Sequence, residues 1–143
     1  MQTKRIVVVD TSVFVSALLN AGGASREVLR RCLRGEFVPL MGAALFTEYE
    51  DVLSREALFS KSLVPARERE RLFDAFLSVC SWTRVYYLWR PNVRDEADNH
   101  LVELAVAGGA ELLLTRNVRD FRGMQLRFDR LEVLRPEDIT KES

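Results

Sequence analysis

Hydrophobic positions near the start of the chain predict a buried strand. Residues 6–9 are four consecutive apolar residues, three of them valine, which fits a strand buried on both faces of a parallel sheet. The run ends at Asp10, and an apolar pattern at helical spacing begins after Thr11 and Ser12, either of which could cap a helix. Asp10 therefore stands at the carboxyl end of a strand, where open α/β sheets bind their ligands.

The rest of the chain alternates between strand-like and helix-like patterns. Further strands are predicted at 37–41, 83–88, 111–114 and 131–134. Helices are predicted from the N-cap Ser25 to Gly35, over 43–55, from 67 to 80, and around 101–108. This alternation is typical of an α/β protein whose parallel sheet is covered by helices on both sides, and we expect a single domain over residues 1–143.

Local features add further expectations. Pro39 favours a position near a strand end or a bulge, because proline lacks a backbone donor. The Arg- and Glu-rich run 67–71 is expected to be a solvated helix face. Pro136 is expected to close the last strand, and the final residues are expected to fray. Aromatic side chains around the third strand are expected in the core more often than at an interface: Trp82, Tyr86, Tyr87 and Trp89.

Composition indicates an ordinary globular protein and leaves the partner open. The 143 residues are 48% hydrophobic, and 21 basic residues balance 21 acidic ones, so net charge argues neither for nor against a nucleic-acid partner. Arginine far outnumbers lysine, which suits phosphate binding but is explained equally well by genomic base composition. No apolar run is long enough to span a bilayer, and a cytoplasmic location without membrane contact is expected.

Three residues with metal-binding side chains are expected to have structural roles. Cys32 and Cys80 lie among apolar neighbours in predicted helices and are expected to be reduced core thiols. His100 is the only histidine, and no second His or Cys stands at metal-ligand spacing from it. We therefore expect His100 to be a surface or supporting residue rather than a metal ligand.

The predicted topology brings several acidic residues toward one edge of the sheet. Right-handed crossovers place every strand-to-helix junction at the same edge, so Asp10, Asn117 and Asp120 belong there. Glu48 and Asp98 fall at the margins of the apolar faces of the helices that follow the second and third strands. We therefore expect these carboxylates near the sheet rather than on an outer surface.

Each acidic residue taken alone has a simpler explanation. Asp98 could interact with its helix N-terminus, Glu48 could lie on the surface, and Asp120 could stabilise a turn. Asp10 is different, because a carboxylate that ends a buried strand needs a partner and no lysine is near it in the sequence. Several carboxylates at one edge would repel one another unless a cation compensates, and an all-oxygen site suits Mg²⁺ or Mn²⁺. Magnesium bound in this way commonly acts on phosphate esters.

Four motifs in this order resemble those of PIN-domain ribonucleases, and in particular the bacterial toxin-like branch that includes the VapC toxins. They are Val-Val-Asp10-Thr11-Ser12, Glu48 in its helix, Arg94-Asp95-x-x-Asp98-x-x-Leu-x-x-x-Ala105, and Leu-Leu-Thr115-Arg116-Asn117-x-x-Asp120-Phe121. The resemblance covers essentially the whole chain. It implies a three-layer α/β/α sandwich with a parallel sheet of strand order 3-2-1-4-5, and a metal-dependent endoribonuclease that cleaves single-stranded RNA.

The resemblance also implies roles for individual residues. Four acids correspond to the metal-binding and catalytic residues of the family, with one or two ions of Mg²⁺ or Mn²⁺: Asp10, Glu48, Asp98 and Asp120. Residues that match supporting or substrate-binding positions are Ser12, Thr115, Asn117, Arg116 and Arg119. Asn117 stands where many relatives have a further Asp. The resemblance therefore leaves open whether a second metal ion binds tightly in the absence of substrate. Either arginine could instead neutralise the acids. Relatives commonly bind a cognate antitoxin and often form homodimers.

Other functions fit the sequence less well. An aspartyl-phosphate phosphohydrolase would carry an acid two residues after Asp10, where this chain has Ser12, and no lysine follows a core strand as that class or a receiver domain requires. A flap-type DNA nuclease would need additional helices. The remaining alternative is a catalytically weak PIN-fold module that binds RNA or protein.

Overall fold

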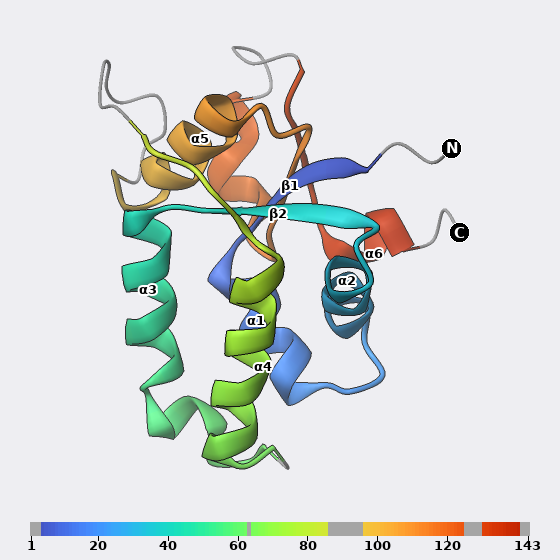
Figure 1. The fold of residues 1–143 in the computed structure, drawn as a ribbon, viewed down its shortest axis with the longest axis vertical. Coiled ribbons are helices and arrows are strands. Elements are labelled where there is room, and N and C mark those ends of the chain that lie inside the picture. The colour runs from blue at the N-terminus through green and yellow to red at the C-terminus, as the bar shows by residue number, and fades with distance from the viewer. Residues whose placement is uncertain (1–3, 63, 86–95, 125–129, 141–143) are drawn as a thin grey trace.

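The computed structural model describes residues 4–62, 64–85, 96–124 and 130–140, with the backbone alone at 96–99 and 122–124 (Figure 1). The strands are β1 (Arg5–Val9), β2 (Phe37–Met41), β3 (Ser81–Trp82), β4 (Leu112–Leu114) and β5 (Glu132–Leu134). The helices are α1 (Thr11–Leu19), α2 (Ala24–Leu33), α3 (Ala43–Leu53), α4 (Ala66–Val79), α5 (Glu96–Gly108) and α6 (Pro136–Thr140), with 3₁₀ helices η1 (Glu56–Phe59) and η2 (Val118–Met124).

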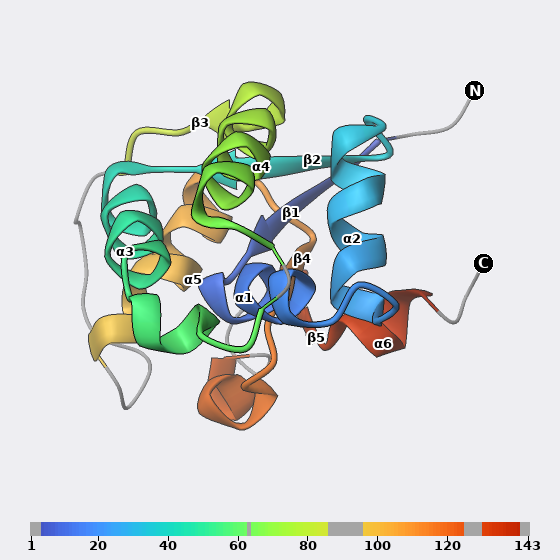
Figure 2. The ribbon, with the colours of Figure 1, turned by 90° about the horizontal axis from the view of Figure 1, so that it is seen from below.

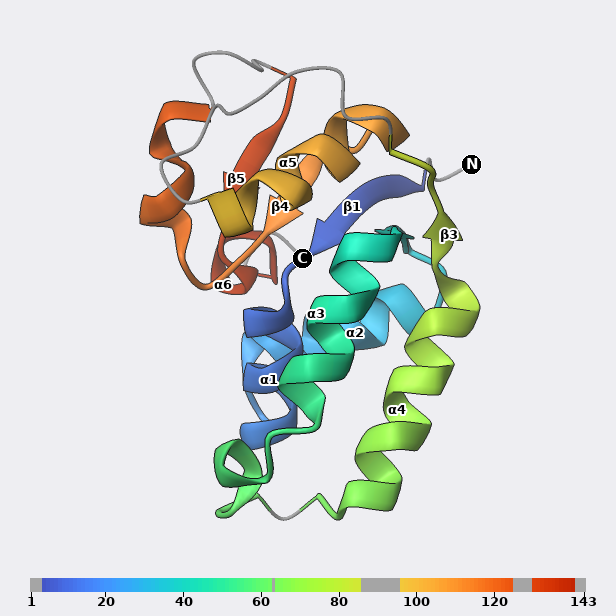
Figure 3. The ribbon, with the colours of Figure 1, turned by 90° about the vertical axis from the view of Figure 1, so that its left-hand side faces the viewer.

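The strands form one parallel sheet with helices on both faces. Their order is β3-β2-β1-β4-β5, which confirms the predicted order 3-2-1-4-5. Figure 1 shows α5 above the sheet and α1, α2, α3 and α4 below it, and Figure 3 shows β3 and β5 at opposite edges. The predicted three-layer α/β/α architecture is therefore confirmed. In Figure 2, α6 lies beside α2.

An aromatic cluster packs below the centre of the sheet. Phe14 of α1 makes edge contacts with Tyr49 of α3 and with Phe73 and Phe76 of α4, at ring-centroid distances of 5.5, 5.9 and 5.5 Å. The Tyr49 ring is fully buried, and its hydroxyl donates a hydrogen bond of 2.7 Å to the carbonyl of Val9, the last residue of β1. The cluster therefore holds α3 against the end of β1, beside Asp10.

The third strand is shorter and earlier than predicted. The prediction was 83–88, but β3 contains only Ser81 and Trp82, while 83–85 are irregular and 86–88 lie outside the described residues. The expectation that Trp82 belongs to the core is wrong, because this side chain is 57% exposed. A two-residue strand at a sheet edge has a free side, so its side chains need not be covered.

Pro39 lies inside β2 rather than near its end. It pairs with Val7 of β1, while β3 pairs only with the two residues that follow Pro39. The edge of β2 that faces β3 is therefore unpaired at Pro39, and a strand paired on one edge tolerates a residue without an N–H donor.

Three other local expectations need correction. Helix α2 begins at Ala24 after the cap Gly23, so Ser25 is a buried residue of its first turn and not the N-cap. Arg69, expected on a solvated face, is only 6% exposed, because it pairs with Glu56 and lies over the Phe59 ring. The segment after the last strand forms α6, a helix that the sequence pattern did not predict, while 141–143 lie outside the described residues.

Other sequence expectations agree with the structure. Gly35 follows α2 with φ of +83°, a backbone conformation that glycine adopts at little cost. Cys32 and Cys80 are both free thiols, and burial raises the pKa of each to about 12. In the described part of the chain, no helix has both the length and the apolar character that crossing a bilayer requires.

The Tyr49 hydroxyl is expected to contribute measurably to stability. In Tyr49→Phe the buried Val9 carbonyl loses its donor, so the free energy of unfolding should fall by about 1–2 kcal/mol. Urea unfolding followed by circular dichroism measures this change. Val106→Ala, on the exposed face of α5, is the control and should change stability by less than about 0.5 kcal/mol. Equal stability of Tyr49→Phe and the wild type would contradict the assigned bond.

Candidate active site

Asp10 is placed by the pairing of β1 with β4. The register sets Val9 opposite Leu114, and the backbone N–H of Asp10 continues the ladder by donating to the Leu114 carbonyl at 2.9 Å. Asp10 and Thr115, the residues that follow Val9 and Leu114, therefore lie opposite each other. The Thr115 hydroxyl donates a hydrogen bond to Asp10 Oδ2 at 2.7 Å. Asp10 is also the N-cap residue of α1, although its side chain makes no capping hydrogen bond.

Neutral hydroxyls hold the Asp10 carboxylate. Asp10 is only 6% exposed, and Oδ2 accepts hydrogen bonds from Ser12 at 2.9 Å and from Thr115. Among the described residues, Oδ1 has only the Thr11 hydroxyl, at 3.4 Å. None of the described residues places a cation on Asp10. A buried carboxylate without a positive partner is costly, and the described contacts leave the negative charge of Asp10 uncompensated.

Glu48 lies next to Asp10 and shares a hydroxyl with it. The Thr11 hydroxyl lies 3.1 Å from Glu48 Oε1, closer than it lies to Asp10. A hydroxyl carries one proton, which therefore favours Glu48 and leaves Asp10 Oδ1 as an oxygen with free acceptor capacity. Thr11, predicted only as a possible cap residue, thus bridges the two carboxylates.

His100 orients Glu48 from the opposite side. Its Nε2 lies 2.7 Å from Glu48 Oε2, and this hydrogen bond, opposed by burial, lowers the pKa of Glu48. Nε2 therefore donates to an ionised carboxylate. His100 Nδ1 is buried and has no hydrogen-bond partner in the described part of the chain. The expectation of a supporting histidine agrees with this contact, although the sequence did not indicate Glu48 as its partner.

The two acids line a cavity of about 450 Å³ at the carboxyl edge of the sheet. Residues that also line it come from α1, from the end of α3 and from the loop after β4: Thr11, Ser12, Asn20, Val52, Arg116 and Asn117. The cavity therefore lies where open α/β sheets bind ligands.

Comparison with known proteins identifies the family. The family model described as "PIN domain" matches residues 6–119 of the 143. The chain belongs to the PIN-domain family. PIN domains are generally nucleases, and as a family they generally use divalent metal ions.

A solved structure agrees with this PIN-domain fold. It is the crystal structure of VapBC2 from Rickettsia felis bound to a DNA fragment from their promoter, with a TM-score of 0.57 and 16% sequence identity. The match covers 91% of this chain and 98% of the other. At this identity the likeness concerns the fold. No curated protein sequence matches the chain.

Within this PIN domain, the structure brings together two of the four predicted acids. Asp98 lies in the first turn of α5, but its side chain is outside the described residues. Asp120 lies in η2 with an exposed side chain and does not line the cavity of Asp10 and Glu48. The roles of Asp98 and Asp120 as ligands stay predictions.

The loop after β4 contributes groups to the site mainly through its backbone. The Arg116 N–H donates to Ser12 Oγ at 3.1 Å, and the Asn117 N–H donates to Thr115 Oγ1 at 3.0 Å. Each hydroxyl therefore accepts from this loop and donates to Asp10. The Asn117 side chain is exposed at the cavity wall and remains available to a ligand.

Among the described contacts, neither arginine of this loop pairs with Asp10 or Glu48. The Arg116 guanidinium pairs with Glu137 of α6 and contacts the Ser25 hydroxyl at 3.5 Å. Arg119 is exposed, and no ion pair joins it to an acid of the described residues. Because the Asp98 side chain is outside the described residues, the alternative that an arginine neutralises the acidic cluster stays a prediction.

The residues present fit a hard divalent cation. No group of three or more His, Cys, Asp or Glu side chains converges on a metal position in the described part of the chain. The observed donors are nevertheless carboxylate oxygens, with acceptor capacity left at Asp10 Oδ1 and, among the described residues, no cation paired with Asp10. Oxygen donors with uncompensated negative charge suit Mg²⁺ or Mn²⁺.

The Thr115 hydroxyl should be important for stability in the absence of metal. Thr115→Val removes a donor to a buried carboxylate, and the free energy of unfolding should fall by about 1.5–3 kcal/mol. Thr115→Ser keeps the hydroxyl and should lose less. Urea unfolding in chelator at pH 7 measures both variants. A Val variant as stable as the Ser variant would show that the hydroxyl is dispensable.

The His100 contact should appear in the titration of Glu48. A carboxyl with a lowered folded pKa contributes stability above its unfolded pKa of about 4.5, and this contribution is lost as the pH falls through the folded pKa. In His100→Leu the pKa of Glu48 should rise, so acid destabilisation should begin at a higher pH. NMR of the side-chain carboxyl carbons, recorded in the presence of a chelator, measures the pKa of Glu48. Glu50, exposed on α3, is the internal control. An unchanged Glu48 pKa would contradict the contact.

Proposed function

We propose that this PIN domain is a Mg²⁺- or Mn²⁺-dependent endoribonuclease that hydrolyses phosphodiester bonds of single-stranded RNA. The observation that carries the proposal is the pair Asp10 and Glu48, which Thr11 bridges in a cavity where the described residues offer Asp10 no cation. Two neighbouring carboxylates can bind a divalent ion, which would compensate their negative charge. The family supports the reaction type, because PIN domains are generally nucleases.

Asp10, Glu48, Asp98 and Asp120 are the residues that would hold one or two ions. When bound, the ions supply an activated water and stabilise negative charge on the reacting phosphate and on the leaving oxygen. In this proposal Asp10 anchors the site, Glu48 and Asp98 complete it, and Asp120 acts at its outer side, directly or through water.

The remaining residues organise the acids and the substrate. Thr11, Ser12 and Thr115 fix the acids through the hydrogen bonds described above, so little rearrangement is needed when an ion enters. Asn117, exposed on the cavity wall, supplies an amide that can donate to a substrate phosphate oxygen. Arg119 adds an exposed positive charge to the same loop.

We also propose that the protein is the toxin of a toxin–antitoxin pair. The support is the family, the VapC-like motifs of the sequence, and the fold shared with a chain of the VapBC2 complex. A cognate antitoxin is the partner expected under this proposal, and the homodimer predicted from the resemblance belongs to it as well.

Removal of Asp10 should abolish cleavage. Labelled single-stranded RNA should be cut in Mg²⁺ or Mn²⁺ and left intact in chelator, and Asp10→Asn should cut at least about 100-fold more slowly because the anchoring carboxylate is lost. Asp51→Asn, an exposed acid on α3 that pairs with Arg55, is the matched control and should cut normally.

Two further measurements separate this proposal from its alternative. Mn²⁺ should raise the melting temperature of the wild type and not that of Asp10→Asn, because an ion that binds only the folded state stabilises it. Cleavage by Asp10→Asn at the wild-type rate would indicate a contaminating nuclease and would refute the assignment. RNA binding without cleavage in any metal would instead support the catalytically weak binding module.

A further inference from the structure

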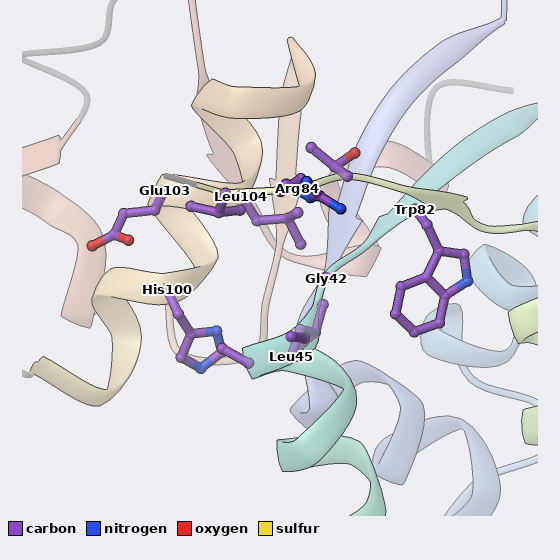
Figure 4. A pocket seen from close by; sticks show the side chains of 11 residues that line it. Gly42, Leu45, Trp82, Arg84, His100, Glu103 and Leu104 are labelled. Carbon is purple, nitrogen blue, oxygen red and sulfur yellow. The ribbon is translucent and has the colours of Figure 1, made fainter. Parts of the chain in front are cut away.

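A second cavity, of about 490 Å³, is lined in part by His100, the residue that binds Glu48 of the acid pair. It is bordered by the start of α3, by the segment that follows β3 and by α5, and its walls include Gly42, Leu45, Trp82, Arg84, His100 and Leu104 (Figure 4). All of these residues belong to the described part of the chain. None of the roles assigned above to the acids, hydroxyls or loop uses this cavity.

Trp82 gives the cavity an exposed aromatic wall. Its side chain is 57% exposed, and the indole is supported by Phe46, with ring centroids 5.6 Å apart. In Figure 4 the indole and the His100 ring lie on opposite sides of Gly42 and Leu45. A supported, half-uncovered indole at a sheet edge offers a planar surface for stacking, and nucleobases of single-stranded RNA stack on such surfaces regardless of their identity.

Two elements, α5 and α3, connect the second cavity to the acid pair. His100 lines this cavity, and its Nε2 binds Glu48, which lines the other one. Leu45 also lines the second cavity, and Glu48 follows it by three residues, a rise of about 4.5 Å along α3. A strand with a phosphodiester at the acid pair can therefore place the base of a neighbouring nucleotide in the second cavity.

Arg84 and Glu103 both line the second cavity, and Arg84 is the one on the side of Trp82. Arg84 is exposed at its wall, and none of the acids in the described residues pairs with it. The Glu103 carboxylate points away from Trp82 in Figure 4. A guanidinium beside an indole can contact the RNA backbone or stack on a base, and an arginine-aromatic pair of this kind is characteristic of single-strand binding sites.

We propose that the cavity between Trp82 and His100 is a subsite for one nucleobase of the RNA strand, adjacent to the phosphodiester at Asp10 and Glu48. This inference rests on the proposed function. It assigns Trp82 the role of stacking platform and Arg84 that of backbone contact. The base is recognised mainly through its face, so the subsite positions the strand more than it selects a sequence.

Binding of RNA without catalysis tests the subsite directly. The probe is a fluorescent single-stranded RNA hexamer in chelator, with the Asp10→Asn protein, and anisotropy gives the affinity. Trp82→Ala should weaken binding about tenfold, and Trp82→Phe should recover most of this loss because a ring remains. Leu33→Ala, which trims an exposed apolar side chain on α2, is the control and should bind like its parent.

A second variant and a modified RNA distinguish stacking from a general disturbance. Ala44→Leu, at a residue of the cavity wall, should fill the space and weaken binding without removing any contact. Hexamers with a single abasic residue should identify one position where loss of the base weakens binding as Trp82→Ala does. At that position Trp82→Ala should cause no further loss of affinity.

Tryptophan fluorescence reports on the stacking itself. In Trp89→Phe protein, which keeps Trp82 as the one tryptophan, the intact hexamer should quench the fluorescence of Trp82.

The outcomes separate this inference from the proposed function. Unchanged RNA affinity in Trp82→Ala and Ala44→Leu overturns the subsite, even if the wild type cleaves RNA. Trp82-dependent binding at one base position supports the subsite, even if no metal supports cleavage and the nuclease proposal fails. If Trp82→Ala leaves RNA binding unchanged and instead weakens binding of a protein partner, the cavity is a protein-docking site and the inference is wrong.

Discussion

The pairing of β1 with β4 is the constraint on which the candidate site depends. Parallel register is fixed by the ladder that ends in the Asp10-to-Leu114 bond, and the Thr115-to-Asp10 hydrogen bond follows directly from it. Side chains alternate between the faces of a sheet, so a slip of one residue would turn either partner away. Two segments about 100 residues apart in sequence are thus brought to one point by backbone geometry alone.

The hydrogen bonds that stabilise the fold at this point also position the two carboxylates. The Tyr49 hydroxyl ties α3 to the end of β1, and the adjacent residue on α3, Glu48, reaches the Thr11 hydroxyl. The same contacts that complete the core therefore set the spacing of the two carboxylates. Asp10 remains buried without a positive neighbour among the described residues, and this destabilises the folded state. A bound cation would offset that destabilisation, because it would pair with the carboxylate.

The sequence predicts the central part of this fold well and its edges poorly. β1 and β2 are identified by apolar runs, and the helical spacing around Leu45 and Tyr49 places Glu48 correctly, because burial on both sides leaves a clear pattern. β3 is misplaced because a two-residue edge strand carries almost no pattern, and its Trp82 is exposed. The Glu48–His100 contact joins residues 52 positions apart, which periodicity cannot reveal.

The pairing of Arg116 with Glu137 links the loop at the cavity of Asp10 and Glu48 to α6, the helix that packs on α2. A guanidinium that is paired with a carboxylate binds a second anion less strongly, so an anionic ligand in the cavity would compete with Glu137 for Arg116. A ligand that took Arg116 from Glu137 would weaken the contact of this loop with α6, and by reciprocity a partner that detached α6 would make the arginine more available. Under that condition, binding in the cavity and docking of α6 would be energetically coupled.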